Sequence, residues 1–116
     1  MENRTENKSG TIFLDIDGTL VYHNYEPDII IDRFIPNTLT WVKERVKEGF
    51  IVMLTTSRSG AHAQKVQKML ADEGVNAFLI AGLGTGMRVV VNDAKEGDAL
   101  KAISINCNRD KGVFNV

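Results

Sequence analysis

Several hallmarks of common protein classes are missing from this chain of 116 residues. It has one cysteine, Cys107, so no internal disulfide can form. No apolar run approaches the roughly 20 residues that a membrane-spanning helix needs, and we expect no membrane partner. The first ten residues are too polar for a secretory signal, so a reducing cytoplasm is the expected location. The formal net charge is only −1, which makes nucleic acid an unlikely partner.

Apolar residues (43%) and charged residues (25%) occur at the frequencies of ordinary soluble domains. A chain of this length is expected to form one domain with a real core. Residues 1–10 lack an apolar pattern after Met1 and are interpreted as a mobile leader. Residues 11–116 contain no repeat and no linker, so we assign them to a single domain.

Apolar runs and helical spacing alternate along the chain. Pro36 suits the start of the first predicted helix and Gly49 its end. This alternation predicts an α/β fold, a three-layer α/β/α sandwich around a five-stranded parallel sheet with right-handed crossovers. The predicted strands are residues 11–14, 50–55, 77–80, 89–91 and 103–105, and the predicted helices are residues 38–47, 61–73 and, briefly, 98–102. Residues 20–35 form an irregular excursion, the natural candidate for a flap.

Polar side chains follow three of the predicted strands. Asp15 and Asp17 end the first, Thr56, Ser57 and Arg58 follow the second, and Asp93 follows the fourth. These ends meet at one edge of a parallel sheet, where open α/β sheets bind ligands. Carboxylates packed together repel one another unless a cation intervenes, and oxygen-only ligands suit Mg²⁺. A hydroxyl and an arginine beside such a metal suggest a phosphate group as ligand.

These residues carry a resemblance to a known family. Asp15-Ile-Asp-Gly-Thr resembles motif I of the haloacid-dehalogenase-like (HAD) phosphohydrolases, Thr56 resembles motif II, and Val-Val-Val-Asn-Asp at residues 89–93 resembles the acidic motif IV. The resemblance implies a phosphatase that acts through an aspartyl-phosphate. Asp15 would be the nucleophile, Asp17 the general acid and base, and Thr56 a ligand of the phosphoryl oxygens.

The resemblance also implies a Mg²⁺ site and a substrate site. The metal would be held by the Asp15 carboxylate, the Asp17 backbone carbonyl and Asp93. Gly18, Ser57 and Arg58 would contact a small phosphorylated substrate.

The cation that such enzymes place beside the nucleophile is not obvious in this sequence. Arg88 stands where motif III is expected, but at the start of the predicted strand 89–91 it would lie about 16 Å from the active edge. Lys95 and Arg58 both follow strand ends, and we predict Lys95 first and Arg58 second. Asp98 either assists the metal through water or caps the short helix.

No inserted cap domain fits between the motifs. The chain therefore resembles capless members of the family, which include polynucleotide, sugar-acid and capsule-related phosphatases, and a polynucleotide end stays open as a substrate. An open site of this kind accepts a bulky substrate or is roofed by a neighbouring subunit, so a homo-oligomer is a further expectation.

Simpler interpretations compete with these. Asp-Gly is a common turn pair, and Thr56 and Ser57 are good helix caps. A second functional class is a phosphate-binding module without turnover, or a receiver-like phosphoacceptor. A receiver carries its accepting Asp after the third strand, where this chain has Ile80-Ala81-Gly82.

Overall fold

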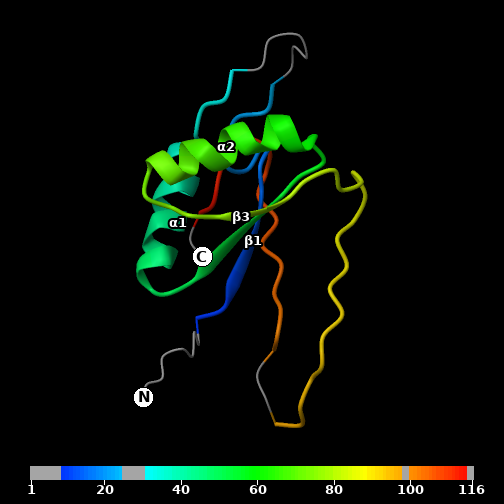
Figure 1. Ribbon diagram of the computed structural model, residues 1–116. Helices are drawn as coiled ribbons and strands as arrows, with labels where there is room; N and C mark the ends of the chain where they lie inside the picture. Colours follow the sequence, from blue (N-terminus) through cyan, green and yellow to red (C-terminus); the bar gives the residue numbers. More distant parts are fainter. Residues whose placement is uncertain (1–8, 25–30, 98–99, 115–116) are drawn as a thin grey trace.

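Three parallel strands and two helices alternate in the first two thirds of the chain (Figure 1). The computed structural model describes residues 9–24, 31–97 and 100–114. Within them lie β1 (Thr11–Asp15), α1 (Pro36–Lys47), β2 (Ile51–Thr55), α2 (Gly60–Asp72) and β3 (Phe78–Ile80). Each agrees with its predicted element to within two residues, and the α/β class is confirmed.

The strands lie in the order β1-β2-β3, and all pairs are parallel. Asp15 is paired in register with Thr55, and Thr55 with Ile80. The carboxyl ends of the three strands therefore meet at one edge, as predicted. Because β1 is the first strand of the order, its outer edge has no strand partner among the described residues.

Helix α1 begins and ends at the residues that the sequence indicated. Pro36 is its first residue, where its fixed φ suits a helix and its missing N–H is not needed. Gly49 has φ 101°, and the N–H of Phe50 donates to the Arg45 carbonyl at 3.1 Å. A residue in this left-handed region after a helix is most often glycine, because it has no Cβ to clash.

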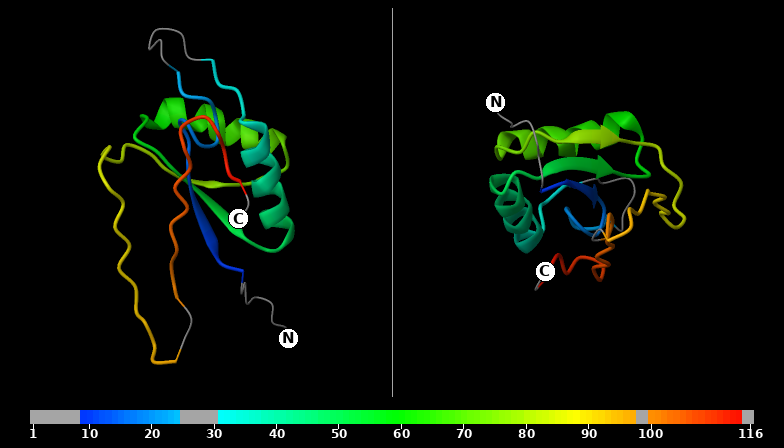
Figure 2. Two further views of the ribbon diagram at one scale, coloured as in Figure 1. Left: turned by 180° about the vertical axis from the view of Figure 1, so that it is seen from behind. Right: turned by 90° about the horizontal axis from the view of Figure 1, so that it is seen from below.

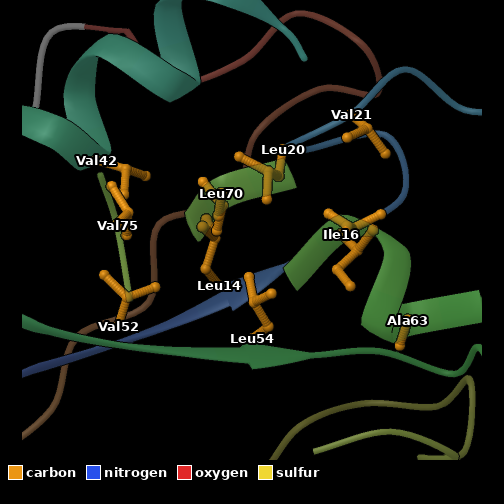
Figure 3. Close-up of a cluster of buried hydrophobic side chains, with 11 residues drawn as sticks. Leu14, Ile16, Leu20, Val21, Val42, Val52, Leu54, Ala63, Leu70 and Val75 are labelled. Carbon is orange, nitrogen blue, oxygen red and sulfur yellow. The ribbon is translucent and has the colours of Figure 1, made fainter. Parts of the chain in front are cut away.

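One face of the sheet carries the core (Figure 3). Leu14, Val52 and Leu54 alternate toward the helices, as every second residue of a strand does. They pack with one residue of α1 and three of α2: Val42, Ala63, Val66 and Leu70. Both helices lie on the same face because both crossovers step in the same direction across the sheet and right-handed crossovers then share a side.

The opposite face of the sheet is exposed. Phe13 is 63% exposed and Phe78 58% exposed, and Ile51 and Ile80 are also exposed. The described residues therefore form two layers, where the sequence predicted three. A second helical layer requires the chain to turn back after β3 and form helices, and the described residues after β3 form none.

The chain after β3 runs out as a long extended segment and returns (Figures 1 and 2, yellow and orange). We call residues 84–97 and 100–106 of this segment the arm. It contains no strand, so the predicted strands 89–91 and 103–105 are not formed and the sheet of the described residues has three strands instead of five. A β-strand is defined by its backbone pairing with a neighbouring strand, and no such pairing involves the described residues of the arm. Of the predicted helix 98–102, residues 98 and 99 lie outside the described residues and residues 100–102 are not helical.

A turn near the C-terminus, residues 108–113, returns to the body; we call it the C-terminal turn. The Asn37 Nδ2 group at the start of α1 donates to the carbonyls of Lys111 (2.9 Å) and Val113 (3.1 Å). Gly112 has φ 77°, and a Cβ there would overlap the Asn37 side chain. The turn thereby ties the end of the described chain to α1.

The predicted flap and leader are covered only in part. Residues 1–8 and 25–30 lie outside the described residues. The two described sides of the flap meet at an antiparallel bridge between Val21 and Phe34, and the Tyr22 N–H donates to the Arg33 carbonyl at 3.0 Å. No helix in the part of the chain that the structure describes is long and apolar enough to cross a membrane.

Candidate active site

The loop after β1 is a tight turn built around one carbonyl group. The Ile16 carbonyl accepts the N–H groups of Thr19, Leu20 and Val21 at 3.0–3.3 Å. The Ile16 side chain is fully buried. Asp15 and Asp17, on either side of it, consequently face away from the core and lie close enough for their charges to interact, as the alternation of an extended chain predicts.

Gly18 allows the C-terminal turn to pack closely against this loop. Its φ is 80°, and a Cβ at this position would lie 3.1 Å from Cγ of Arg109. The Gly18 carbonyl accepts the N–H of Asp110 at 2.8 Å, and Asp110 Oδ1 accepts the His23 N–H at 2.7 Å. The C-terminal turn therefore packs directly on the loop after β1, next to Asp17. Sequence reasoning missed Arg109 and Asp110.

The surroundings of Asp15 change the pKa of its carboxyl group. Burial of its carboxyl group raises its pKa above the ordinary value, and the nearby charge of Asp17 acts in the same direction. Thr19 Oγ1 donates to Asp15 Oδ2 at 3.2 Å and opposes the rise, as does the charge of Arg88. Arg88 thus influences the very carboxylate from which the predicted strand 89–91 would have separated it.

Asp17 is held by an arginine from the loop after β2. Arg58 Nη2 donates to Asp17 Oδ1 at 2.7 Å, and Arg58 Nε donates to Asp17 Oδ2 at 3.0 Å. The Arg58 side chain is only 10% exposed, whereas that of Asp17 is 30% exposed. This two-pronged geometry is the strong form of an arginine–carboxylate pair.

A second carboxylate, Asp32, binds the far side of the same guanidinium. Arg58 Nη2 donates to Asp32 Oδ1 at 2.7 Å and Nη1 to Asp32 Oδ2 at 3.2 Å. The Asp32 side chain is 4% exposed. Hydrogen bonds to Asp17, followed by those to Asp32, raise the pKa of Arg58 above its ordinary value against the opposing effect of burial. Sequence reasoning missed Asp32, because a lone Asp in an irregular segment carries no pattern.

Thr56 lies at the predicted position, directly after β2. It is fully buried, its N–H donates to the Ile80 carbonyl at 3.1 Å, and its Oγ1 accepts the Arg58 N–H at 3.0 Å. Helix α2 has Ser59 as its N-cap, without a side-chain capping bond. Thr56 and Ser57 are therefore not the cap of α2, and the Thr56 hydroxyl instead holds the turn that leads to Arg58.

A pocket of about 350 Å³ opens beside Asp17. Every residue of its lining is polar, and three of them are sequence-predicted site residues. The lining consists of Asp17, His23, Asn24, Ser57, Arg58, Ser59 and His62. Such a lining fits a small, hydrogen-bonding ligand next to the Asp17 carboxylate.

Asp93 and Lys95 lie in the arm and are exposed. In the described part of the chain neither makes an ion pair, and no three His, Cys, Asp or Glu side chains gather as a metal site would require. Asp98 lies outside the described residues. Two predicted metal ligands, Asp15 and Asp17, are therefore together, and the third is held away because the arm does not pair with β1.

The oxygen ligands that lie at the end of β1 supply only part of the coordination shell of a hard cation. The carboxylate of Asp15 and the backbone carbonyl of Asp17 are oxygen ligands, and Mg²⁺ commonly takes one or two protein carboxylates and completes its shell with water and phosphate. The Asp17 carboxylate itself is engaged by Arg58.

We compared the chain with protein-family models, with curated proteins and with solved structures, and none of the three comparisons found a match.

Proposed function

We propose that this protein is a Mg²⁺-dependent phosphatase of the HAD type, which hydrolyses phosphate monoesters through an aspartyl-phosphate. The observation that carries the proposal is the pair Asp15 and Asp17 at the carboxyl end of β1, beside Thr56 at the end of β2. Two carboxylates that differ in their surroundings can divide the work of nucleophile and proton carrier.

In the first step, an Asp15 carboxylate oxygen attacks phosphorus and the bond to the ester oxygen breaks. Asp17, as general acid, transfers a proton to the departing alcohol. In the second step, Asp17 takes a proton from water, whose oxygen attacks phosphorus and releases inorganic phosphate and the Asp15 carboxylate. Covalent catalysis of this kind divides one difficult displacement into two easier ones.

Mg²⁺, when bound, neutralises the charge between the carboxylate and the phosphate dianion. The Asp15 carboxylate and the Asp17 carbonyl would hold it, with Asp93 as a third ligand. The Thr56 hydroxyl, Gly18 and Ser57 would orient the phosphoryl group from the ends of β1 and β2.

We propose in addition that the arm closes on the free edge of β1 to complete a five-stranded sheet, with residues 89–91 beside β1 and residues 103–105 next to them. Two features support this. The outer edge of β1 has no strand partner among the described residues, and Val89, Val90 and Val91 are exposed. A parallel strand beside β1 would bring Asp93 to the edge where Asp15 lies, with Lys95 two residues further on.

Closure of the arm also affects which basic side chain can lie beside Asp15 and neutralise the phosphate. Lys95 stays our first candidate, because it lies two residues after Asp93 and would reach the same edge of the sheet. Arg88, whose charge acts on Asp15 in this structure, is the second candidate and serves only while the arm is open, because a parallel strand at 89–91 would place it about 16 Å from the active edge. Arg58 is no longer a candidate, because its guanidinium is paired with Asp17 and Asp32.

The test is turnover of p-nitrophenyl phosphate with and without Mg²⁺ by the wild type, Asp15→Asn and Asp17→Asn. The matched control is Asp72→Asn, which removes an exposed carboxylate on α2 that pairs with Lys68 among the described residues. We expect Mg²⁺-dependent turnover in the wild type and the control and its loss in Asp15→Asn. Unchanged turnover in Asp15→Asn, or turnover without metal, contradicts the mechanism.

Lys95→Ala and Arg88→Ala separate the two candidate cations. Loss of kcat in Lys95→Ala alone supports our ranking. Full kcat in Lys95→Ala together with loss in Arg88→Ala reverses it.

The alternative function is a phosphate-binding or phosphoacceptor module without turnover. The separation of Asp93 and Lys95 from the carboxylates favours it, because the residues that are together include the Asp15 acceptor but lack the third metal ligand and the predicted cation. Acetyl phosphate would then label Asp15 stably, whereas a phosphatase releases inorganic phosphate continuously.

A further inference from the structure

The guanidinium of Arg58 has no donor left for a substrate. Arginine carries five N–H donors. Nε binds Asp17, and Nη2 is shared between Asp17 and Asp32. Nη1 donates to Asp32 and, at 3.2 Å, to the carbonyl of His62 in α2. All five donors are therefore satisfied within the protein.

We propose that Asp32 is a positioning residue, which acts through Arg58 to hold the Asp17 carboxylate in its working orientation at the pocket. This rests on the proposed function, in which Asp17 carries the proton. Sequence reasoning had placed Arg58 among the substrate-binding residues, and the proposal gives it a different role.

Burial explains why Arg58 stays with its two carboxylates. Asp32 is 4% exposed, so a turn of Arg58 toward a phosphate would leave a buried carboxylate without its partner. Removing one partner of a buried ion pair is strongly unfavourable, because the remaining charge is neither hydrated nor compensated.

The geometry explains how the pair acts on Asp17. Arg58 reaches both oxygens of Asp17, which fixes the plane of the carboxylate as well as its place. Asp32 in turn binds the other end of the same planar fork and prevents it from rotating. The three residues come from three separate segments: Asp17 from the loop after β1, Asp32 from the flap, and Arg58 from the loop before α2. Lysine has no such planar fork and cannot substitute for it.

The kinetic test compares Asp32→Asn and Arg58→Lys with the control Asp72→Asn, using p-nitrophenyl phosphate as substrate and inorganic phosphate as inhibitor. We expect kcat to fall by about tenfold or more in both variants, because a misplaced catalytic group reacts slowly. KM and the inhibition constant of phosphate should change by less than about twofold, since no phosphate ligand is removed. The control should match the wild type.

The opposite split overturns the proposal. If Arg58 binds phosphate, Arg58→Lys raises KM and the inhibition constant while kcat is retained. If Asp32 has no effect on either constant, it is not a positioning residue. Circular dichroism of each variant establishes that it is folded, and Arg58→Lys serves alone if Asp32→Asn does not fold.

A second measurement does not depend on activity and separates this inference from the proposed function. The urea midpoints of Asp17→Asn, Asp32→Asn and the double variant are measured with Arg58 present and again in an Arg58→Gln background. Coupling of the two aspartates through Arg58 predicts non-additive shifts in the first set and additive shifts in the second. Additive shifts in both sets overturn the inference even if the enzyme is active, and non-additive shifts support the Asp17–Arg58–Asp32 link even if no phosphatase activity is found.

Discussion

The body of the molecule, residues 11–80, and the arm contain similar apolar runs, but the runs adopt different structures in the two regions. Residues 51–55 and residues 89–91 are both rich in β-branched side chains, yet the first run is the central strand of a sheet and the second is extended and exposed. In the body, helices α1 and α2 cover one face of the sheet, whereas in the arm no described residue covers the valines. β-Propensity describes a fit to a pleated, half-buried surface, so it is expressed only where neighbours provide that surface.

The largest expected difference between body and arm is catalytic. Asp15→Asn in the body should lower kcat by at least about 10³-fold, because it removes the nucleophile. Asp93→Asn in the arm should leave substantial turnover and raise the Mg²⁺ concentration needed for half-maximal activity. Titration of p-nitrophenyl phosphate turnover with Mg²⁺ measures both. An equal Mg²⁺ requirement in Asp93→Asn and the wild type contradicts closure of the arm.

The next difference is in stability, and the same substitution can be made in both regions. Leu54→Ala removes a fully buried side chain of β2 and should lower the free energy of unfolding by about 2–5 kcal/mol. Leu100→Ala removes a side chain in the arm that is 85% exposed and should change it by less than about 0.5 kcal/mol. Urea denaturation without ligand measures both values. A large cost for Leu100→Ala would mean that the arm is packed in solution.

Two glycines give a smaller contrast. Gly112→Ala in the C-terminal turn should cost about 1–3 kcal/mol, because its φ is 77° and a Cβ would overlap Asn37. Gly84→Ala in the arm meets nothing within 4 Å and should cost less than about 0.5 kcal/mol. Thermal unfolding of the two variants tests the comparison. Equal melting temperatures would mean that the C-terminal turn is not docked on α1.

The smallest effect concerns Cys107, where the arm returns to the body. Burial raises the pKa of its thiol above the ordinary value, so less reactive thiolate is present at any pH below that pKa. Alkylation by iodoacetamide at pH 8 should therefore be several-fold slower in the native protein than in urea. Equal rates in the two conditions would show that Cys107 is not covered.

The elements that could be predicted are those with a complete local signal. Helix α1 has a proline at its start, a glycine after its end and an apolar stripe between, and it was predicted to within two residues. The loop from Asp15 to Thr19 was predicted from its charge pair after an apolar strand. The strands at 89–91 and 103–105 had apolar runs alone, and such runs do not specify a partner.

The site divides in the same way. Asp15, Asp17 and Thr56 were predicted because strand ends of a parallel sheet meet at one edge. Asp32 was not predicted, because its pairing with Arg58 joins residues 26 positions apart through a flap with no periodic pattern. Arg109, over Gly18, was missed for the same reason.

The sequence by itself determined the alternation of strands and helices and the placement of two carboxylates at the carboxyl end of β1, since apolar periodicity and turn residues act over a few positions. Only the tertiary structure decided that Arg58 is held between Asp17 and Asp32, that the C-terminal turn covers Gly18, and that the apolar arm is left outside the sheet. These outcomes depend on contacts between distant segments, whose energies are set by burial and geometry in three dimensions rather than by neighbours along the chain.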